Sequence, residues 1–242
     1  MPVKFNTKDA LSKYKKLGGK TFFEDDLKDV LKYIQNDKNI NTVEQAAYLL
    51  ATAKTESDYS FERWEADYVC GKKGVAYKNK PCQKALNYYR STDGKKNYYL
   101  KGVDDRGLPY FGRGLIQLTG QSNYKKYGDR IGVNLEKNPE LVFKPKNSYG
   151  VTSEFLKEKT WKYVDKGELT LARRSVNGGI NGLDEVNSEY NKWLEAFKKK
   201  EVKFKKTKTT KKQRKINIIG YSILGVSFVG LAYAFYHFTN KK

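Results

Sequence analysis

Two glutamates, Glu56 and Glu65, stand nine positions apart, with the turn-like residues 57–60 and an aromatic-rich stretch between them. Two carboxylates on either side of a cleft can divide the work of glycoside hydrolysis. One, protonated, donates to the leaving oxygen, and the other, ionised, activates water. Most acidic side chains are solvated surface groups, so this pair alone identifies no reaction.

Three separated blocks of sequence supply the missing specificity. Residues 46–57 read AAYLLATAKTES, residues 110–124 read YFGRGLIQLTGQSNY, and residues 176–190 read VNGGINGLDEVNSEY. In this order they resemble the glycoside hydrolases of family 19, the chitinases and their phage-endolysin branch. The resemblance covers residues 20–197. It implies a mainly α, lysozyme-like fold with two lobes and a central cleft, and cleavage of β-1,4 links in N-acetylated sugar polymers with inversion.

The resemblance also implies roles for individual residues. Glu56 matches the general acid, Glu65 the general base of the endolysin branch, and Thr119 the hydroxyl residue that helps to hold the attacking water. It also implies that some residues bind substrate: Gln117, Asn123, Tyr124, Asn181 and Arg113. The guanidinium of Arg113, in the glycine-rich block, would face the cleft.

Two positions leave the catalytic assignment open. The family usually has a histidine directly before the acid, where this chain has Thr55, which puts the pH optimum and the rate in question. Glu62 lies three residues before Glu65, and a small shift in alignment would exchange them as base. Gln117 could equally be a structural hydrogen-bonding residue.

The aromatic residues beside these blocks have two interpretations. Trp64, Tyr110 and Phe111 could stack on sugar faces, but aromatic side chains belong more often to a core. Trp161 and Trp193 have the spacing of packing residues.

No metal or cofactor is expected. The single histidine, His237, lies in an apolar segment, and the spacing of Cys70 and Cys82 is not a zinc pattern. These two cysteines could form a disulfide or remain as thiols.

Helix signals dominate residues 1–197. Thr7 precedes a helix that ends at Gly18-Gly19, Thr21 opens a second helix, and Thr42 with Gln45 forms a capping-box pattern before a third. Further helices are expected at 81–90, 121–130, 147–160 and 183–198, and residues 91–112 are expected to form a loop with a short hairpin.

The positive charge is unevenly distributed. The chain has 242 residues and a net charge of +21, of which residues 198–242 carry +12 and residues 1–197 carry +9. Residues 216–238 contain no formal charge, and such a helix would span about 34 Å, enough to cross a bilayer core. We therefore expect a hydrolase domain at 1–197, a basic linker at 198–215 that attracts anionic headgroups, a transmembrane helix, and a short tail at 239–242.

The excess of basic residues before the span predicts that the domain faces the cytoplasm at insertion. The N-terminus has no secretory signal pattern. A single-pass protein with a C-terminal anchor is therefore expected, in the internal membrane of a virion or the host inner membrane, with capsid or membrane proteins as possible neighbours.

The sequence favours a peptidoglycan hydrolase, a phage lytic enzyme acting in entry or exit, because the glutamate spacing follows the endolysin branch. Peptidoglycan is polyanionic and would attract a basic domain. A chitinase and a non-catalytic wall-binding structural protein of a virion are the alternatives. A specific nucleic-acid binder is not expected, because no base-reading motif accompanies the charge.

Overall fold

The computed structural model describes residues 1–65, 104–105 and 109–198, and these are mainly helical. Residues Met1–Lys198 form one compact unit. The predicted helix at 81–90, most of the predicted loop at 91–112, Cys70 and Cys82 lie outside the described residues, as do the linker and the predicted span. Among the described helices, none has the length and apolar character needed to cross a bilayer.

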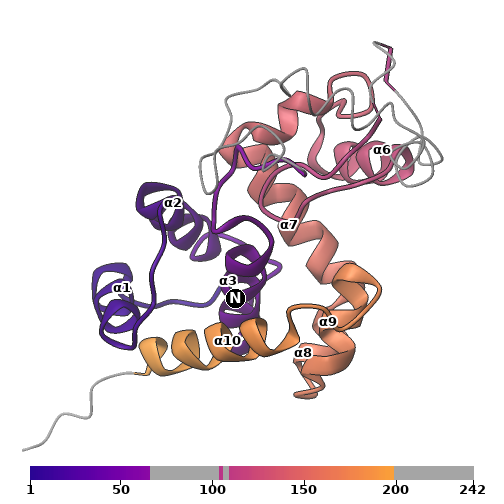
Figure 1. Ribbon diagram of the computed structural model, residues 1–242. Coiled ribbons are helices and arrows are strands. Elements are labelled where there is room, and N and C mark those ends of the chain that lie inside the picture. The colour runs from indigo at the N-terminus through magenta and orange to yellow at the C-terminus, as the bar shows by residue number, and fades with distance from the viewer. Residues whose placement is uncertain (66–103, 106–108, 199–242) are drawn as a thin grey trace, which may run out of the picture. The chain divides into compact units, whose positions relative to one another are not determined.

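One group of helices is built on α3 (Val43–Ser57) and α10 (Leu183–Phe197). The helix α10 packs on α3 although it closes the unit in sequence, α1 (Thr7–Lys16) packs on α10, and α2 (Glu24–Ile34) contacts α1 (Figure 1). Residues 46–53 of α3 are buried on all sides, and their several alanines permit close approach.

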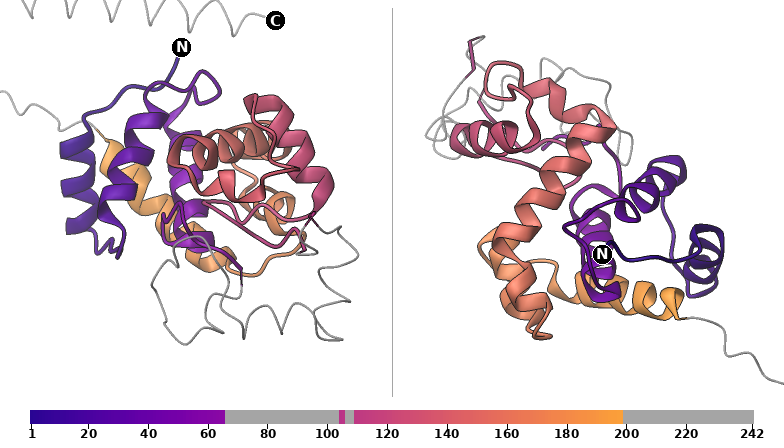
Figure 2. Two further views of the ribbon diagram at one scale, coloured as in Figure 1. Left: turned by 90° about the horizontal axis from the view of Figure 1, so that it is seen from above. Right: turned by 180° about the vertical axis from the view of Figure 1, so that it is seen from behind.

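A second group is organised around α7 (Pro145–Lys159). The helix α6 (Gln121–Ile131) and a 3₁₀ segment (Pro139–Phe143) pack at one end of α7, and the short α8 (Trp161–Val164) and α9 (Leu169–Asn177) pack at the other, as two views show (Figures 1 and 2). The two groups meet where α2 and α3 contact α7. The predicted helical character is confirmed, whereas the central cleft stays a prediction.

The helix starts differ slightly from those expected. The cap of α1 is Asn6, whose side chain accepts from the Asp9 amide, because Thr7 is already helical. Thr21 accepts from the Phe23 amide, but α2 begins only at Glu24. The cap of α3 is Thr42 as predicted, with Gln45 reaching the amide of Asn41 rather than that of Thr42.

A buried polar network fixes the chain after α3. Tyr14 stacks on Trp193 with ring centroids 4.0 Å apart, and its hydroxyl donates to Glu189 at 2.6 Å. The Tyr59 hydroxyl donates to Tyr14 at 3.1 Å and accepts from the Trp193 indole at 3.0 Å. Burial raises the pKa of Tyr59 well above its ordinary value, so the hydroxyl stays a donor. The network joins α1, α10 and the turn between the two candidate glutamates.

The aromatic residues of uncertain role belong to the core. Trp64, Tyr110 and Phe111 are almost fully buried, so the interpretation as sugar-stacking residues is wrong for them and the packing interpretation is confirmed. Trp161 and Trp193 are also buried, as predicted.

Candidate active site

Glu56 lies at the C-terminal end of α3, where its side chain is 18% exposed. Its Oε1 accepts from Nη1 of Arg173 at 2.5 Å, across 117 positions of sequence. The guanidinium is itself fixed, because its Nε donates to the Asn181 carbonyl at 2.7 Å. A buried guanidinium from α9 therefore holds Glu56, and the Oε1 atom of Glu56 forms this ion pair.

Arg173 is the site residue that sequence reasoning missed. It is 4% exposed and stands directly before the VNGGINGL block, so its place beside a recognised motif was the available signal. Its ion pair with Glu56 depends on how α9 packs, which no local pattern reports. Gly182 allows this approach, since an added Cβ would lie 3.1 Å from the Thr55 methyl and 3.3 Å from Arg173 Nη2.

Glu65 is held in a different way. Its amide donates to the Gly112 carbonyl at 2.7 Å, and the Gly112 amide donates to Glu65 Oε2 at 3.0 Å. Next to this pair, the Gly114 amide donates to the Arg63 carbonyl at 2.7 Å. The segment that carries Glu65 is thus paired with the glycine-rich loop, defined here as residues 110–120.

The same loop reaches the end of α3. The Ser57 hydroxyl, next to Glu56, donates to the Leu115 carbonyl at 3.1 Å. Gly114 has a φ of +74°, and an added Cβ would lie 2.5 Å from Ser148 Oγ and 2.8 Å from Val142 Cγ1. Glycine is required there both by the backbone and by the space. One loop therefore positions the segments that carry both glutamates.

The predicted polar residues of the loop make internal hydrogen bonds. Gln117, at a φ of +52°, donates through Nε2 to the carbonyls of Arg63 and Gly114 at 3.1 and 2.9 Å. The Thr119 hydroxyl donates to the Gln117 carbonyl at 2.9 Å and keeps its lone pairs for a further donor. Asn123 donates to the Thr119 carbonyl at 2.8 Å. These contacts support the structural interpretation of Gln117.

Two predicted substrate contacts are corrected. Arg113 is 1% exposed, so its guanidinium does not face a cleft. Tyr124 is fully buried, and burial raises its pKa to about 12, which keeps its hydroxyl protonated. That hydroxyl accepts from Arg113 Nη1 at 2.9 Å and donates to the Phe111 carbonyl at 2.8 Å. Both residues support the loop from within the core.

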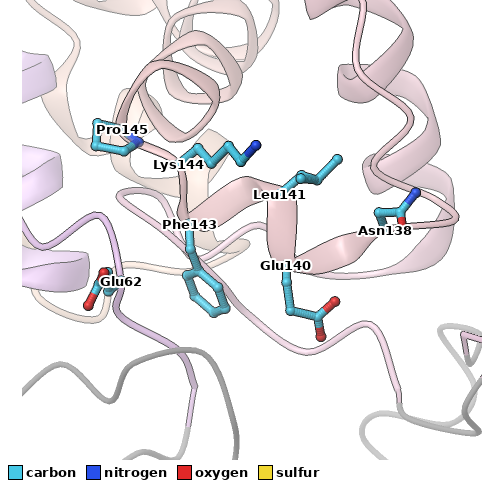
Figure 3. Close-up of a pocket in the computed structure, with 7 residues that line it drawn as sticks. All are labelled: Glu62, Asn138, Glu140, Leu141, Phe143, Lys144 and Pro145. Carbon is cyan, nitrogen blue, oxygen red and sulfur yellow. The ribbon is translucent and has the colours of Figure 1, made fainter.

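Glu62 occupies different surroundings from Glu65. It lines a pocket of about 450 Å³ together with residues of the 3₁₀ segment and the start of α7, and in Figure 3 Phe143 lies between Glu62 and Glu140. A second pocket, of about 270 Å³, shares Glu62 and reaches Asp26. Glu62 faces these pockets, whereas Glu65 pairs with Gly112, and the choice of Glu65 as the base stays a prediction.

Asn181 lies in the exposed loop between α9 and α10. Its carbonyl accepts from Arg173 and from the Asn177 side chain, at 2.7 and 3.0 Å, so its backbone is fixed beside Glu56. The role of its side chain in binding substrate stays a prediction. Among the described residues, no group of histidine, cysteine or acidic side chains could hold a metal ion.

Two glutamates in different surroundings, one paired with a guanidinium of α9 and one bonded to the glycine-rich loop, could divide the acid–base work of a hydrolysis. Comparison with protein families agrees: residues 34–147 match the family described as Chitinase class I, glycoside hydrolase family 19. The match includes Glu56, Glu65 and the glycine-rich loop. Over these residues, slightly less than half of the chain, the protein is therefore similar to glycoside hydrolase family 19.

Individual relatives give the same class. A glycosyl hydrolase family 19 domain-containing protein of Haemophilus influenzae is 33% identical over 129 residues, 52% of this chain and 58% of that protein. Chitinase 8 of Oryza sativa is 62% identical over 34 residues, 14% of this chain and 13% of that protein. The chain thus spans between about an eighth and three fifths of these relatives. The crystal structure of chitinase C from Streptomyces griseus is 24% identical, covers 78% of this chain and 66% of that chain, and has a TM-score of 0.42.

Proposed function

We propose that the chain is a membrane-anchored peptidoglycan hydrolase that cleaves β-1,4 glycosidic bonds by an inverting, two-carboxylate mechanism. The observation that favours this reaction most is that the two glutamates have chemically different hydrogen-bond partners. Glu56 is paired with a buried guanidinium, and Glu65 is fixed by the Gly112 peptide. Two carboxylates in different environments can take different roles in acid–base catalysis.

In the proposed reaction, Glu56 donates a proton to the glycosidic oxygen as the bond to the anomeric carbon breaks. Glu65 accepts a proton from a water molecule that attacks the same carbon from the opposite face, which inverts its configuration. The Thr119 hydroxyl accepts a hydrogen bond from that water while it donates to the Gln117 carbonyl. No metal or cofactor takes part in this scheme.

Peptidoglycan is the substrate that we favour. The nine-residue interval between the glutamates follows the endolysin branch, and a domain with a charge of +9 attracts an anionic wall polymer. Chitin is the second candidate, and the similarity to the rice protein chitinase 8 supports it. Chitin is neutral, so the charge of the domain would contribute nothing to its binding.

The non-catalytic alternative rests on Thr55. Its hydroxyl is buried and, among the described residues, has no hydrogen-bond partner, whereas a histidine at this position could orient the acid. A wall-binding protein without turnover would keep the fold and lose that tuning. The intact pairs at Glu56 and Glu65 favour the enzyme over this alternative.

For the rest of the chain, we propose that residues 216–238 anchor the protein and that the basic linker binds anionic headgroups. The charge bias would place the domain on the cytoplasmic side, away from the wall. A virion with an internal membrane resolves this conflict, because a domain between that membrane and the capsid would meet the wall during entry.

Replacing Glu65 and Glu62 by glutamine, one at a time, tests which of them is the general base. We expect Glu65→Gln to lower kcat on purified wall fragments by about 10²-fold or more, because the attacking water loses its proton acceptor. The matched control, Glu62→Gln, should keep kcat within about 2-fold. The reverse pattern would reassign the base to Glu62, and full activity in both variants would reject the mechanism.

A further inference from the structure

We propose that Arg113 is a positioning residue that acts on Glu65 through a single peptide group, the one formed by the Phe111 carbonyl and the Gly112 amide. The proposal rests on the assignment of Glu65 as the base. It gives a role to the one strongly buried cation of the glycine-rich loop.

The two sides of this peptide group have different partners. Its oxygen accepts from Arg113 Nη1 at 3.2 Å and from the Tyr124 hydroxyl at 2.8 Å. Its N–H donates to Glu65 Oε2 at 3.0 Å. A cation and a hydroxyl on the carbonyl polarise the amide and make its N–H a stronger donor. Arg113 therefore both fixes the direction of this N–H and strengthens its bond to the carboxylate.

The backbone of Arg113 reinforces the same geometry. Arg113 forms isolated antiparallel bridges with Trp64 on one side and with Leu118 on the other. Its amide donates to the Leu118 carbonyl at 3.2 Å, and the Leu118 amide donates back at 3.0 Å. The backbone of Arg113 is thus paired with the segment that ends in Glu65, which fixes the position of its guanidinium.

Packing alone does not account for a guanidinium here. Its Cζ lies 3.5 Å from the centroid of the Phe111 ring, and Nη2 lies 3.7 Å from Glu140 Oε1. Within the described part of the chain, Nε and Nη2 have no hydrogen-bond partner. A buried charge with spare donors often stabilises a fold less than an apolar side chain of similar size. Besides the ion pair with Glu140, the charge has a second partner in the Phe111–Gly112 peptide group, and this is the contact that leads to Glu65.

Three variants test the proposal on the full chain. Arg113→Met keeps length and apolar contacts but removes the charge and the donors, and Arg113→Lys keeps the charge. Tyr124→Phe removes the second donor to the Phe111 carbonyl, together with the hydroxyl that accepts from Arg113. We expect Arg113→Met to lower kcat by about 10- to 100-fold with KM within about 2-fold. The acid limb of its kcat–pH profile should move to higher pH, because the carboxylate form of the base loses support. The lysine variant should fall between wild type and Arg113→Met.

The control is Arg130→Met, which removes an arginine of α6 that pairs with Glu154 and Glu158. It should change thermal stability without moving the acid limb. An unmoved limb in Arg113→Met, after correction for the folded fraction, would overturn the proposal. If Arg113→Met does not fold, Tyr124→Phe takes its place as the test. We then expect the acid limb of the kcat–pH profile to move to higher pH by a smaller amount, and an unmoved limb would overturn the proposal. Full activity of Glu65→Gln would instead reject the base assignment itself.

Discussion

Glu56 and Glu65 receive their support from chemically different groups. A guanidinium holds the first at 2.5 Å, and a peptide N–H holds the second at 3.0 Å. The resemblance to known sequences could place both glutamates, because their residue types and spacing lie within short blocks. It could not supply Arg173 or the buried role of Arg113, because each depends on which segments meet in the folded chain.

Asp26 gives a residue-scale prediction of pH dependence. Burial raises the pKa of its carboxyl above the ordinary 3.8, the Glu62 charge adds to this, and the hydrogen bond from the Phe61 amide opposes it. Since the folded pKa is raised, this group favours the folded state below pH 3.8 and loses that contribution as pH rises through the raised value.

Asp26→Asn should therefore remove part of the loss of stability that the wild type shows as the pH rises from 3.8 through the raised pKa of Asp26. Asparagine can still accept from the Phe61 amide through Oδ1. Urea unfolding at several pH values measures the effect, with the exposed Asp25→Asn as control. A loss of stability of Asp26→Asn relative to wild type as the pH is raised would contradict this prediction.

At the scale of elements, the glycine-rich loop connects the two segments that carry Glu56 and Glu65. It binds the chain before Glu65 through Gly112 and Gly114, and the end of α3 through Leu115. Sequence patterns could predict α3, α6, α7 and α10, which are long and have clear periodicity or caps. They missed α8, α9 and the 3₁₀ segment, because elements of four to nine residues are stabilised by packing rather than by a local pattern.

Gly114 and Gly132 form a matched pair for testing the loop. Both have positive φ, +74° and +69°, but only at Gly114 would an added Cβ contact neighbouring atoms within 4 Å. Gly114→Ala should therefore destabilise the fold by about 1–3 kcal/mol more than Gly132→Ala, as measured by denaturant unfolding. It should also lower kcat in the folded fraction. Equal costs for the two variants would show that the loop tolerates displacement.

At the scale of the molecule, the proposed function gives the positive charge two roles. The +9 of residues 1–197 would attract an anionic polymer, and the +12 of residues 198–242 would lie beside the proposed span. The compact unit Met1–Lys198 has its own core, so its chemistry can be measured separately from that of the tail.

Flotation with lipid vesicles tests the proposed anchor. The full chain should float with both anionic and neutral vesicles, because an apolar helix inserts into either. Anionic vesicles should also bind a chain that ends at residue 215, in a salt-dependent manner, through the basic linker. A chain that ends at residue 197 should remain unbound under the same conditions. Flotation of that shortest chain, or no flotation of the full chain, would contradict the assignment.

The most direct test of the central claim is mass spectrometry of the fragments released from purified peptidoglycan by wild type, Glu56→Gln and Glu44→Gln. Glu44 is an exposed carboxylate at the other end of α3, so its variant controls for loss of charge on that helix. We expect wild type and Glu44→Gln to release glycan fragments cut at β-1,4 bonds, and Glu56→Gln to release them at least about 10³-fold more slowly. Equal release by Glu56→Gln, or cleavage by wild type of chitin oligomers alone, would contradict the claim.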